Sequence, residues 1–498
     1  MTPMSEFDPP EASLRRLVGR GAAVTGLSQA AQMVIQFTSV LLLARLLSPE
    51  DFGLIAMCAP IISLLMMLQD FGLVQATVQK KGLTRSEVNV LFWINLAVSA
   101  GLALLLALAS PLIASFYQEP RIGPLIAATS VTVLLAGSGA QHVALLNRRM
   151  AFGQLAIVSV VNSGMALVGA VAWSLVSPSY WALFFGTLLG LVLSTALAWI
   201  FSRWRPTMPR RVEGAGNLLK FGAGITGFNL ANFVARNGDN VLIGRAWGEL
   251  QLGFYDRAYK LLLFPLQQIA NPLSKVMVPA LSRLEGEPDR YRHAFLRVQN
   301  LSLLASLPGV AFMTAMADVL IPFMLGPKWE PSAMIFAALG FAGLVQTLSN
   351  PTGWLFISQG RSGDYATWGL VSAVIAVGSF LLGLPYGAFG VAVAYAVSET
   401  LKSPILWVVA CRKGPIRLGD VVRSCGPMML AAYGSLAAAW WIKSDLGDGP
   451  LQTLTLALAL CYIVFILLIL PFSSGRSTLR EAGALLRQLA TRFRRAQA

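Results

Sequence analysis

Residues 229–275 read NLANFVARNGDNVLIGRAWGELQLGFYDRAYKLLLFPLQQIANPLSK, which is two long apolar segments interrupted by charges. The charges inside the apolar segments include Arg236, Asp239, Arg257 and Lys260. An Arg, Lys or Asp at the centre of a membrane-spanning helix costs about 2.5–3.5 kcal/mol, so such residues usually face a protein interior or a wet cavity. The stretch therefore predicts a polar cavity inside a helical membrane protein.

The composition of the whole chain agrees with a membrane protein. It is 56% hydrophobic and only 12% charged, and apolar runs recur from end to end. Runs of about 18–25 residues are long enough to cross a bilayer as helices. We therefore expect an all-α, polytopic membrane protein. The first twenty or so residues are charged and lack an apolar core, so we expect no cleavable signal peptide.

The apolar runs predict about fourteen transmembrane helices. The first six lie near 22–47, 52–78, 88–116, 122–146, 153–176 and 180–202. The next six lie near 218–245, 252–281, 296–325, 332–358, 364–384 and 387–410, and the last two near 424–442 and 451–471.

This pattern divides the chain into six parts. We expect a basic cytoplasmic lead-in, an N-lobe of six spans, a cytoplasmic linker, a C-lobe of six spans, two further spans and an amphipathic basic tail that anchors to the membrane surface. Their ranges are 1–21, 22–202, 203–217, 218–410, 424–471 and 475–498. Lys and Arg alternate between rich and poor loops in this scheme, and the positive-inside rule then places both termini in the cytoplasm.

The two groups of six spans share a pattern at an offset of about 200 residues. ARLLSPEDFG, ending at Gly53, aligns with GRAWGELQLG, ending at Gly253. Polar residues also recur at i, i+3 and i+7, a spacing that puts them on one helix face. They are Gln29, Gln32 and Gln36 in the first span, and Asn229, Asn232 and Arg236 in the seventh. We therefore expect two pseudo-symmetric lobes, with the substrate site between them.

Several strings resemble a known family of transporters. In the first half these are ARLLSPEDFGLIAM, LQDFGL, VQKKGLTRSE, LFWINL and ASFYQEP, and in the second half FNLANFVARNGDNVLIG, LGFYDRAYKLLLFP and VMVPALSRL. Together they resemble polysaccharide flippases of the MOP superfamily, in the Wzx-type lipopolysaccharide and exopolysaccharide branch. The similarity runs from about Gly21 to about Arg423.

The resemblance implies a function and a cargo. Such a flippase carries a polyprenyl-diphosphate-linked oligosaccharide from the inner to the outer leaflet of the bacterial cytoplasmic membrane, by alternating access of two lobes. Its partners would be this lipid-linked oligosaccharide, membrane lipids and other polysaccharide export and polymerisation proteins. The net charge of +15 is then expected to meet anionic lipid headgroups and not nucleic acid.

A cavity for this cargo needs cations for the diphosphate and amides for the sugars. Arg236, Arg257 and Lys260 are the candidate phosphate ligands, since arginine binds phosphate in a bidentate manner and lysine as a point charge. The candidate sugar ligands are the amides of Gln29, Gln32, Gln36, Asn229, Asn232 and Asn240. By analogy with the family, the last two spans would offer an apolar slot for the lipid tail.

Structural roles compete with these functional ones. Arg236 could simply pair with Asp239, and Glu399 with Lys402, because each pair stands at i, i+3. The glutamine stripe could join helices, and Arg257 with Lys260 could sit at a solvated helix end. Ion coupling through Asp239 or through Glu399 and Lys402 is the functional alternative.

Other classes of function find less support. There is no Walker motif, and the spacing of four cysteines and two histidines predicts neither a metal site nor a cofactor. A multidrug or cation efflux carrier of the same superfamily is the first alternative, but its cationic cargo would favour carboxylates and aromatics. A membrane polymerase or glycosyltransferase would need catalytic carboxylates in a long outer loop, and every outer loop expected here is short. We therefore expect a transporter and no enzyme.

Overall fold

In the computed structural model, backbone is described for residues 14–70, 74, 77–78, 80, 82–208, 215–443 and 449–497, and side chains for these except 14–20, 22, 70, 215–232, 234–236, 489–490 and 492–497. Every regular element in this described part is a helix, which confirms the expected all-α fold. The side chains of three predicted site residues, Asn229, Asn232 and Arg236, lie outside the described residues.

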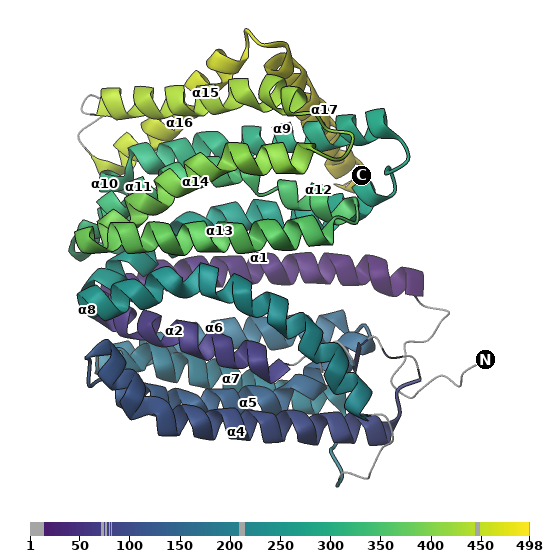
Figure 1. Ribbon diagram of the computed structural model, residues 1–498, viewed down its shortest axis with the longest axis vertical. Coiled ribbons are helices and arrows are strands. Elements are labelled where there is room, and N and C mark those ends of the chain that lie inside the picture. The colour runs from purple at the N-terminus through teal and green to yellow at the C-terminus, as the bar shows by residue number, and fades with distance from the viewer. Residues whose placement is uncertain are drawn as a thin grey trace. The chain divides into compact units, whose positions relative to one another are not determined.

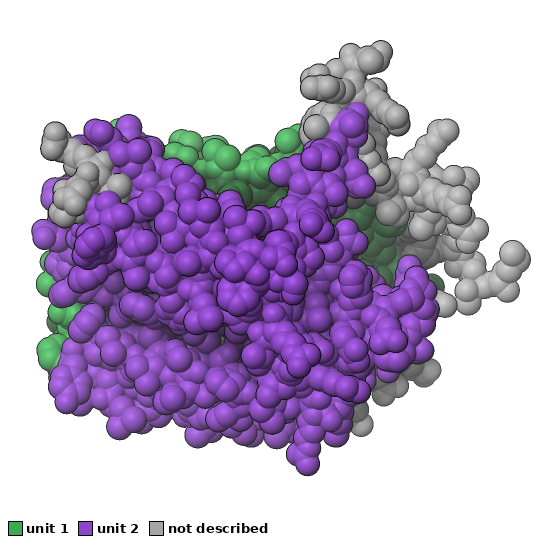
Figure 2. Space-filling view, turned by 90° about the horizontal axis from the view of Figure 1, so that it is seen from above, with its two compact units in different colours: residues 1–253 green, residues 254–498 purple. Residues whose placement is uncertain are grey.

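The chain forms two compact units, residues 1–253 and 254–498 (green and purple in Figure 2). Unit 1 holds α1 (Leu14–Leu46), α2 (Pro49–Asp70), α4 (Arg85–Tyr117), α5 (Ile122–Arg148), α6 (Phe152–Val176) and α7 (Trp181–Ser202). The long helix α8 (Ala215–Ser282) begins in unit 1 and ends in unit 2, and Gly248 interrupts it with non-helical backbone angles of φ 77° and ψ −174°.

Unit 2 continues with a second series of helices (Figure 1). They are α9 (Pro288–Ala315), α10 (Ala317–Leu325), η2 (Pro327–Trp329), α11 (Pro331–Ser349), α12 (Thr352–Ser358), α13 (Ser362–Gly383), η3 (Leu384–Tyr386), α14 (Gly387–Cys411), α15 (Leu418–Ile442), α16 (Pro450–Ile469) and α17 (Ser473–Gln497). The helix bounds follow the expected spans closely. Two expected spans are each divided into two helices, at Met316 and at Asn350–Pro351.

Local sequence explains where helices begin and end. Thr84 accepts from the backbone N–H of Glu87, and the Glu87 carboxylate accepts from the N–H of Thr84, so a complete capping box starts α4. Gln118 ends α4 in the left-handed conformation. Pro331 begins α11 at a position where its missing N–H leaves no hydrogen bond unmade.

By length and composition, ten helical stretches of the described residues could cross a membrane. One of them, 362–411, contains both α13 and α14, whereas α8 and α15 are not among the ten. The chain is therefore a multi-pass membrane protein. Its exposed leucines, valines and isoleucines, such as Leu108, Leu175 and Leu382, are what helices facing lipid tails require.

Each unit has helix pairs that lie side by side. In unit 1, α4 packs on α5, and α6 packs on both α7 and α1. In unit 2, α14 packs between α11 and α13, while α9 packs on α15 and α16 (Figure 1). The core of unit 2 is a cluster of buried apolar side chains that includes Phe295, Trp354, Trp407 and Phe465. The tail helix α17 packs on α9, α15 and α16, with Leu479 against this core.

Candidate functional site

The charged segment of α8 in unit 2 centres on Asp256. Its carboxylate is buried, and one oxygen lies 2.8 Å from Lys260 Nζ while the other lies 3.8 Å from Arg257 Nε. The Arg257 side chain is only 13% exposed, whereas that of Lys260 is 49% exposed. The structure thus brings two predicted phosphate ligands together around one carboxylate, which leaves the trio with a net charge of +1.

The unit 1 part of α8 carries the other predicted charges. Asp239 is buried, and its carboxylate accepts from the backbone N–H of Asn240 at 2.9 Å. Asn240 is half-buried. The backbone is helical through Asn229, Asn232 and Arg236, so their spacing does place them on one face, although their side chains lie outside the described part.

The glutamine stripe of α1 is largely uncovered by its own unit. Gln29 and Gln36 are exposed, and Gln32 is half-buried and donates to Ser28 Oγ at 3.1 Å, one turn earlier on the same helix. These hydrogen bonds of Gln32 lie within α1. The exposed amides on this face are accessible for hydrogen bonds to a polar ligand.

A second charged group lies inside unit 2, on α14. Lys402 Nζ is 2.6 Å from Glu399 Oε1, and both side chains are about one-tenth exposed. Lys402 also donates to Ser372 Oγ of α13 at 2.9 Å and lies 6.0 Å from the Tyr395 ring. The predicted pairing of Glu399 with Lys402 is therefore present, and the pair ties α14 to α13.

Hydroxyl and amide groups extend this buried polar cluster toward α11. Gln346 donates to Tyr395 Oη at 2.7 Å, and the hydroxyls of Ser349 and Ser403 lie 2.7 Å apart. The sequence analysis did not identify these neighbours. Their serines and amides are spread over three helices, so no spacing along the chain could have pointed to them.

An apolar groove of about 620 Å³ lies on unit 2 along α11 and α14. It is lined by Met334, Ala337, Ala338 and Phe341 of α11, by Phe389, Val393, Ala396, Val397, Thr400 and Leu401 of α14, and by Tyr433 of α15. The groove thus follows the face of α14 opposite to the Glu399–Lys402 pair. It uses only one residue of the last two spans, which the sequence analysis had expected to form the apolar slot.

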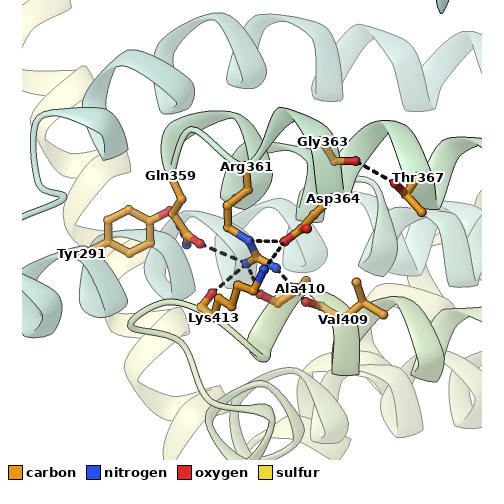
Figure 3. Close-up of polar contacts among 9 residues, drawn as sticks. All are labelled: Tyr291, Gln359, Arg361, Gly363, Asp364, Thr367, Val409, Ala410 and Lys413. Atoms are coloured by element: carbon orange, nitrogen blue, oxygen red, sulfur yellow. Dashed lines mark hydrogen bonds and ion pairs between the residues drawn. The ribbon is translucent and has the colours of Figure 1, made fainter.

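Arg361, just before α13, donates several hydrogen bonds from one guanidinium group (Figure 3). Its guanidinium donates to the carbonyls of Val409, Ala410 and Lys413 at 2.7–2.9 Å, and to the Asp364 carboxylate at 3.0 Å. It therefore caps the carboxyl end of α14, where a positive charge is favoured by the helix dipole. The sequence analysis had not identified this cap.

Unit 1 has a related arrangement at the end of α7. Arg149 donates to the carbonyl of Ser202 at 2.7 Å, and His142 Nδ1 lies 2.8 Å from Ser202 Oγ. The His142 ring packs against Trp199 in a tilted arrangement, at 4.2 Å between ring centroids. His142 is buried, which favours the role of a packed polar residue.

The chain matches known proteins over most of its length. Residues 42–334 match the polysaccharide biosynthesis protein family. Among curated relatives, it is 22% identical to the lipopolysaccharide biosynthesis protein WzxC of Escherichia coli (strain K12) over 404 residues, 80% of this chain and 81% of that one. It is 25% identical to the succinoglycan biosynthesis transport protein ExoT of Rhizobium meliloti (strain 1021) over 473 residues, 94% of this chain and 95% of that one.

A solved structure shares the fold. The inward closed conformation of the lipid II flippase MurJ superposes with a TM-score of 0.73 at 13% sequence identity, covering 89% of this chain and 98% of that one. The family match spans more than half of the chain and includes the charged segment of α8. The protein therefore belongs to the polysaccharide biosynthesis protein family, and its fold is that of the lipid II flippase MurJ.

Proposed function

We propose that this protein is a flippase for a polyprenyl-diphosphate-linked oligosaccharide, the repeat unit of a lipopolysaccharide or exopolysaccharide. It moves the glycan and diphosphate from the cytoplasmic to the outer leaflet by alternating access. The observation that carries the proposal is family membership together with relatives named for polysaccharide biosynthesis and transport. The fold of a lipid II flippase supports it independently.

The charges of α8 suit a diphosphate. Lys260 is the accessible cation of the Asp256 trio, and Arg257 supplies a second positive charge beside it. A diphosphate arriving at Lys260 competes with Asp256 for the ammonium group, so binding would be strong enough to hold the cargo and still weak enough to release it. We assign the diphosphate to Lys260 and Arg257, and extend this assignment to Arg236. The amides of α1 and α8 would bind the sugars.

The charge pattern also separates this function from cation efflux. A carrier of cationic drugs needs carboxylates that a cation can reach. In the described part of unit 2, Asp256 and Glu399 each lie within ion-pair distance of a lysine. We therefore rank multidrug or cation efflux second. Export of a cationic dye by the purified protein, with no effect on lipid-linked glycans, would favour it.

Deleting the gene tests the proposed cargo directly. Mass spectrometry of the lipid fraction should then show an oligosaccharide still attached to its polyprenyl diphosphate, because the glycan is made but not flipped. A strain that carries the intact gene on a plasmid is the control and should show no such accumulation. A deletion strain with unchanged lipid-linked glycans and normal surface polysaccharide would contradict the proposal.

The role of Lys260 is tested by Lys260→Ala in the complemented strain. Export should fall about tenfold, the loss expected when one charge-assisted contact to phosphate is removed. Lys275→Ala is the matched control, because Lys275 is also exposed on α8 but lies four turns away. Equal export by both variants would remove Lys260 from the site.

We further propose that both termini lie in the cytoplasm of a bacterium whose inner membrane holds the protein. The basic loops support this orientation through the positive-inside rule. Alkaline phosphatase fused after Gln497 should then be inactive, and fused after Glu119, in the loop between α4 and α5, it should be active. The reverse pattern would invert the topology.

Transport could be driven in two ways, and the two mechanisms predict different results in proteoliposomes. Either an ion gradient drives transport through Asp239 or the Glu399–Lys402 pair, or the flip is uncoupled and consumption of cargo outside drives it. In proteoliposomes, a dependence of flipping on an imposed proton or sodium gradient that is lost in Glu399→Gln would assign coupling to α14. Flipping that ignores every gradient would support the uncoupled mechanism.

A further inference from the structure

The tail helix α17 is fixed to unit 2 at its start. Gly475 packs so closely on the end of α16 that a Cβ there would lie 2.1 Å from the carbonyl oxygen of Ile469. Leu479 packs on the apolar core of unit 2, and Glu481 Oε2 lies 3.1 Å from Arg297 Nε of α9. The first turns of α17 are therefore held by the helices α9, α15 and α16.

The side of α17 that packs on unit 2 continues beyond this contact. Its buried and half-buried residues are spaced at i, i+3, i+4 and i+7, and they are Gly475, Thr478, Leu479 and Ala482. Leu485 and Leu486, at i+10 and i+11, prolong the same side, and their side chains are 38% and 67% exposed. One side of the helix is thus covered by protein at its start and exposes two leucines in the next turn.

Arginines occupy the opposite side of the helix. Arg476, Arg480 and Arg487 stand at i, i+4 and i+11, which places them in one stripe, and all three are exposed. A helix with an apolar side and a basic side is typical of the membrane interface. There the apolar side enters the boundary of the acyl chains, while long arginine side chains reach up to the phosphates.

The start of α17 lies at the end of a membrane span. The preceding helix α16 is long and apolar enough to cross a membrane and ends at Ile469. α17 begins at Ser473 and leaves the direction of α16 at a sharp turn (Figure 1). The chain therefore leaves the hydrocarbon layer just before α17. With the termini in the cytoplasm, as proposed above, α17 lies at the inner leaflet, whose anionic lipids attract basic segments.

We propose that residues 480–497, which we call the lipid arm, bind anionic phospholipids of the inner leaflet. Leu485 and Leu486 enter the boundary between headgroups and acyl chains, and Arg480 and Arg487 pair with lipid phosphates. The ion pair of Glu481 with α9 sets the direction of the arm before it meets lipid, which lowers the entropic cost of binding. The anchoring tail expected from the sequence is thereby narrowed to one side of one helix and to one class of lipid.

A second copy of the chain fits this surface less well than lipid does. A stable protein interface buries about 1,200–2,000 Å² in total, far more than the two exposed leucines offer. Two copies would also bring two arginine stripes close together, and like charges repel.

Nitroxide labels on the full-length protein in nanodiscs test the lipid arm. Leu486→Cys is labelled in a chain whose four native cysteines are replaced. Thr491→Cys is the matched control, because Thr491 is exposed on the opposite side of the same helix. In discs of phosphatidylglycerol and phosphatidylcholine, the label at 486 should be reached by oxygen and be about fivefold or more less accessible to a nickel chelate than the label at 491. Equal accessibility of both labels to the chelate would overturn the proposal.

A second comparison tests the need for anionic lipid. The ratio of lipid-contacting to aqueous label at 486 should fall about fivefold in Arg480→Gln and again in Arg487→Gln, since each removes one charge near the anionic surface. Arg283→Gln is the matched control, because exposed Arg283 belongs to unit 2 but not to α17, and it should leave the ratio unchanged. Discs of phosphatidylcholine alone should also lower the ratio. A ratio that is the same in both lipids and in both α17 variants would overturn the assignment to anionic lipid.

The same labels detect other occupants of the surface. A label at 486 shielded from both oxygen and the nickel chelate would show that protein covers the leucines. Dipolar broadening between labels in discs that hold two copies would identify a second copy of the chain. Either result would overturn the lipid arm.

Discussion

The helix pair α6–α7 in unit 1 and the helix pair α13–α14 in unit 2 hold matching places in the repeat, and the pair in unit 2 adds a buried ion pair to its glycine contact. Glycines bring the backbones together in both pairs. A Cβ on Gly190 of α7 would lie 2.3 Å from the carbonyl oxygen of Asn162, and a Cβ on Gly390 of α14 would lie 2.4 Å from that of Gly383. In unit 2, the buried Glu399–Lys402 pair on α14 reaches Ser372 of α13. Small residues give a close, dry contact, whereas the ion pair places charge inside the membrane.

The turns that lead into these pairs match in backbone conformation. Met150, before α6, has φ 54°, and Gly360, before α13, has φ 65°. An arginine of each turn also donates a hydrogen bond to a backbone carbonyl at the carboxyl end of the second helix of the pair. Arg149 donates to Ser202 at the end of α7, and Arg361 donates to Ala410 at the end of α14. The repeat therefore preserves the path of the chain, while the groups inside each unit have diverged. Of these two helix pairs, only the one in unit 2 holds a buried ion pair.

Removing the lysine of the charged pair should have the largest effect. Lys402→Met leaves Glu399 buried without its partner, and we expect a loss of about 3–5 kcal/mol in unfolding free energy. Glu399→Gln combined with Lys402→Met should regain most of that stability. Thermal unfolding can be followed with a thiol-reactive fluorophore, because Cys58, Cys425 and Cys461 are buried. A single variant as stable as wild type would show that the pair does not hold the two helices together.

Removing the arginine of the unit 2 turn should come next. Arg361→Ala leaves several carbonyls at the end of α14 without a donor, and we expect a loss of about 2–4 kcal/mol. Arg361→Lys should recover little, because lysine lacks the planar set of donors. The matched variant Arg149→Ala in unit 1 tests whether both turns matter equally. If Arg149→Ala lowers the unfolding free energy as much as Arg361→Ala does, the two turns contribute equally to stability.

Alanine substitutions of one glycine in α6 and one in α13 should change the unfolding free energy in opposite directions. A Cβ on Gly169 of α6 would lie 2.9 Å from Leu189 Cδ2 and 3.1 Å from Gly186 Cα, whereas a Cβ on Gly378 of α13 meets nothing within 4 Å. Gly169→Ala should therefore lose about 1–3 kcal/mol, and Gly378→Ala should gain up to about 1 kcal/mol from helix propensity. The same fluorescence assay measures both. Equal shifts would mean that α6 packs no more tightly at Gly169 than α13 does at Gly378.

An exposed ion pair should matter least. Arg121→Gln, which breaks the contacts to Glu119 and Glu249, should change the unfolding free energy by less than about 1 kcal/mol because Arg121 is half-exposed. The hydrogen bond from Arg121 holds the pKa of the Glu119 carboxyl below its ordinary value. A lowered carboxyl pKa stabilises the folded state above the ordinary pKa, and this contribution is lost as the pH falls through the lowered one. The variant should thus differ from wild type at neutral pH and converge with it in acid. A difference that grows in acid would contradict the assignment.

Much of the fold could be predicted from the sequence, because apolar length and loop charge determine where helices begin and end. The divisions at Met316 and at Pro351 were not predicted, since both fall within continuous apolar runs. The site was harder to predict. The pairing of Glu399 with Lys402 follows from i, i+3 spacing on one helix. The contacts of Lys402 with Ser372, and of Arg361 with Ala410, join residues 30 and 49 positions apart, which no helical periodicity relates.

The most direct test of flipping is a leaflet assay with purified components. The protein is reconstituted into liposomes with the lipid-linked oligosaccharide isolated from the deletion strain, and a lectin outside the vesicles reports glycans that reach the outer leaflet. We expect cargo from the inner leaflet to become accessible within the assay when the wild-type protein is present, and more slowly with Lys260→Ala. Equal accessibility in protein-free liposomes and in liposomes with the wild-type protein would contradict a flippase.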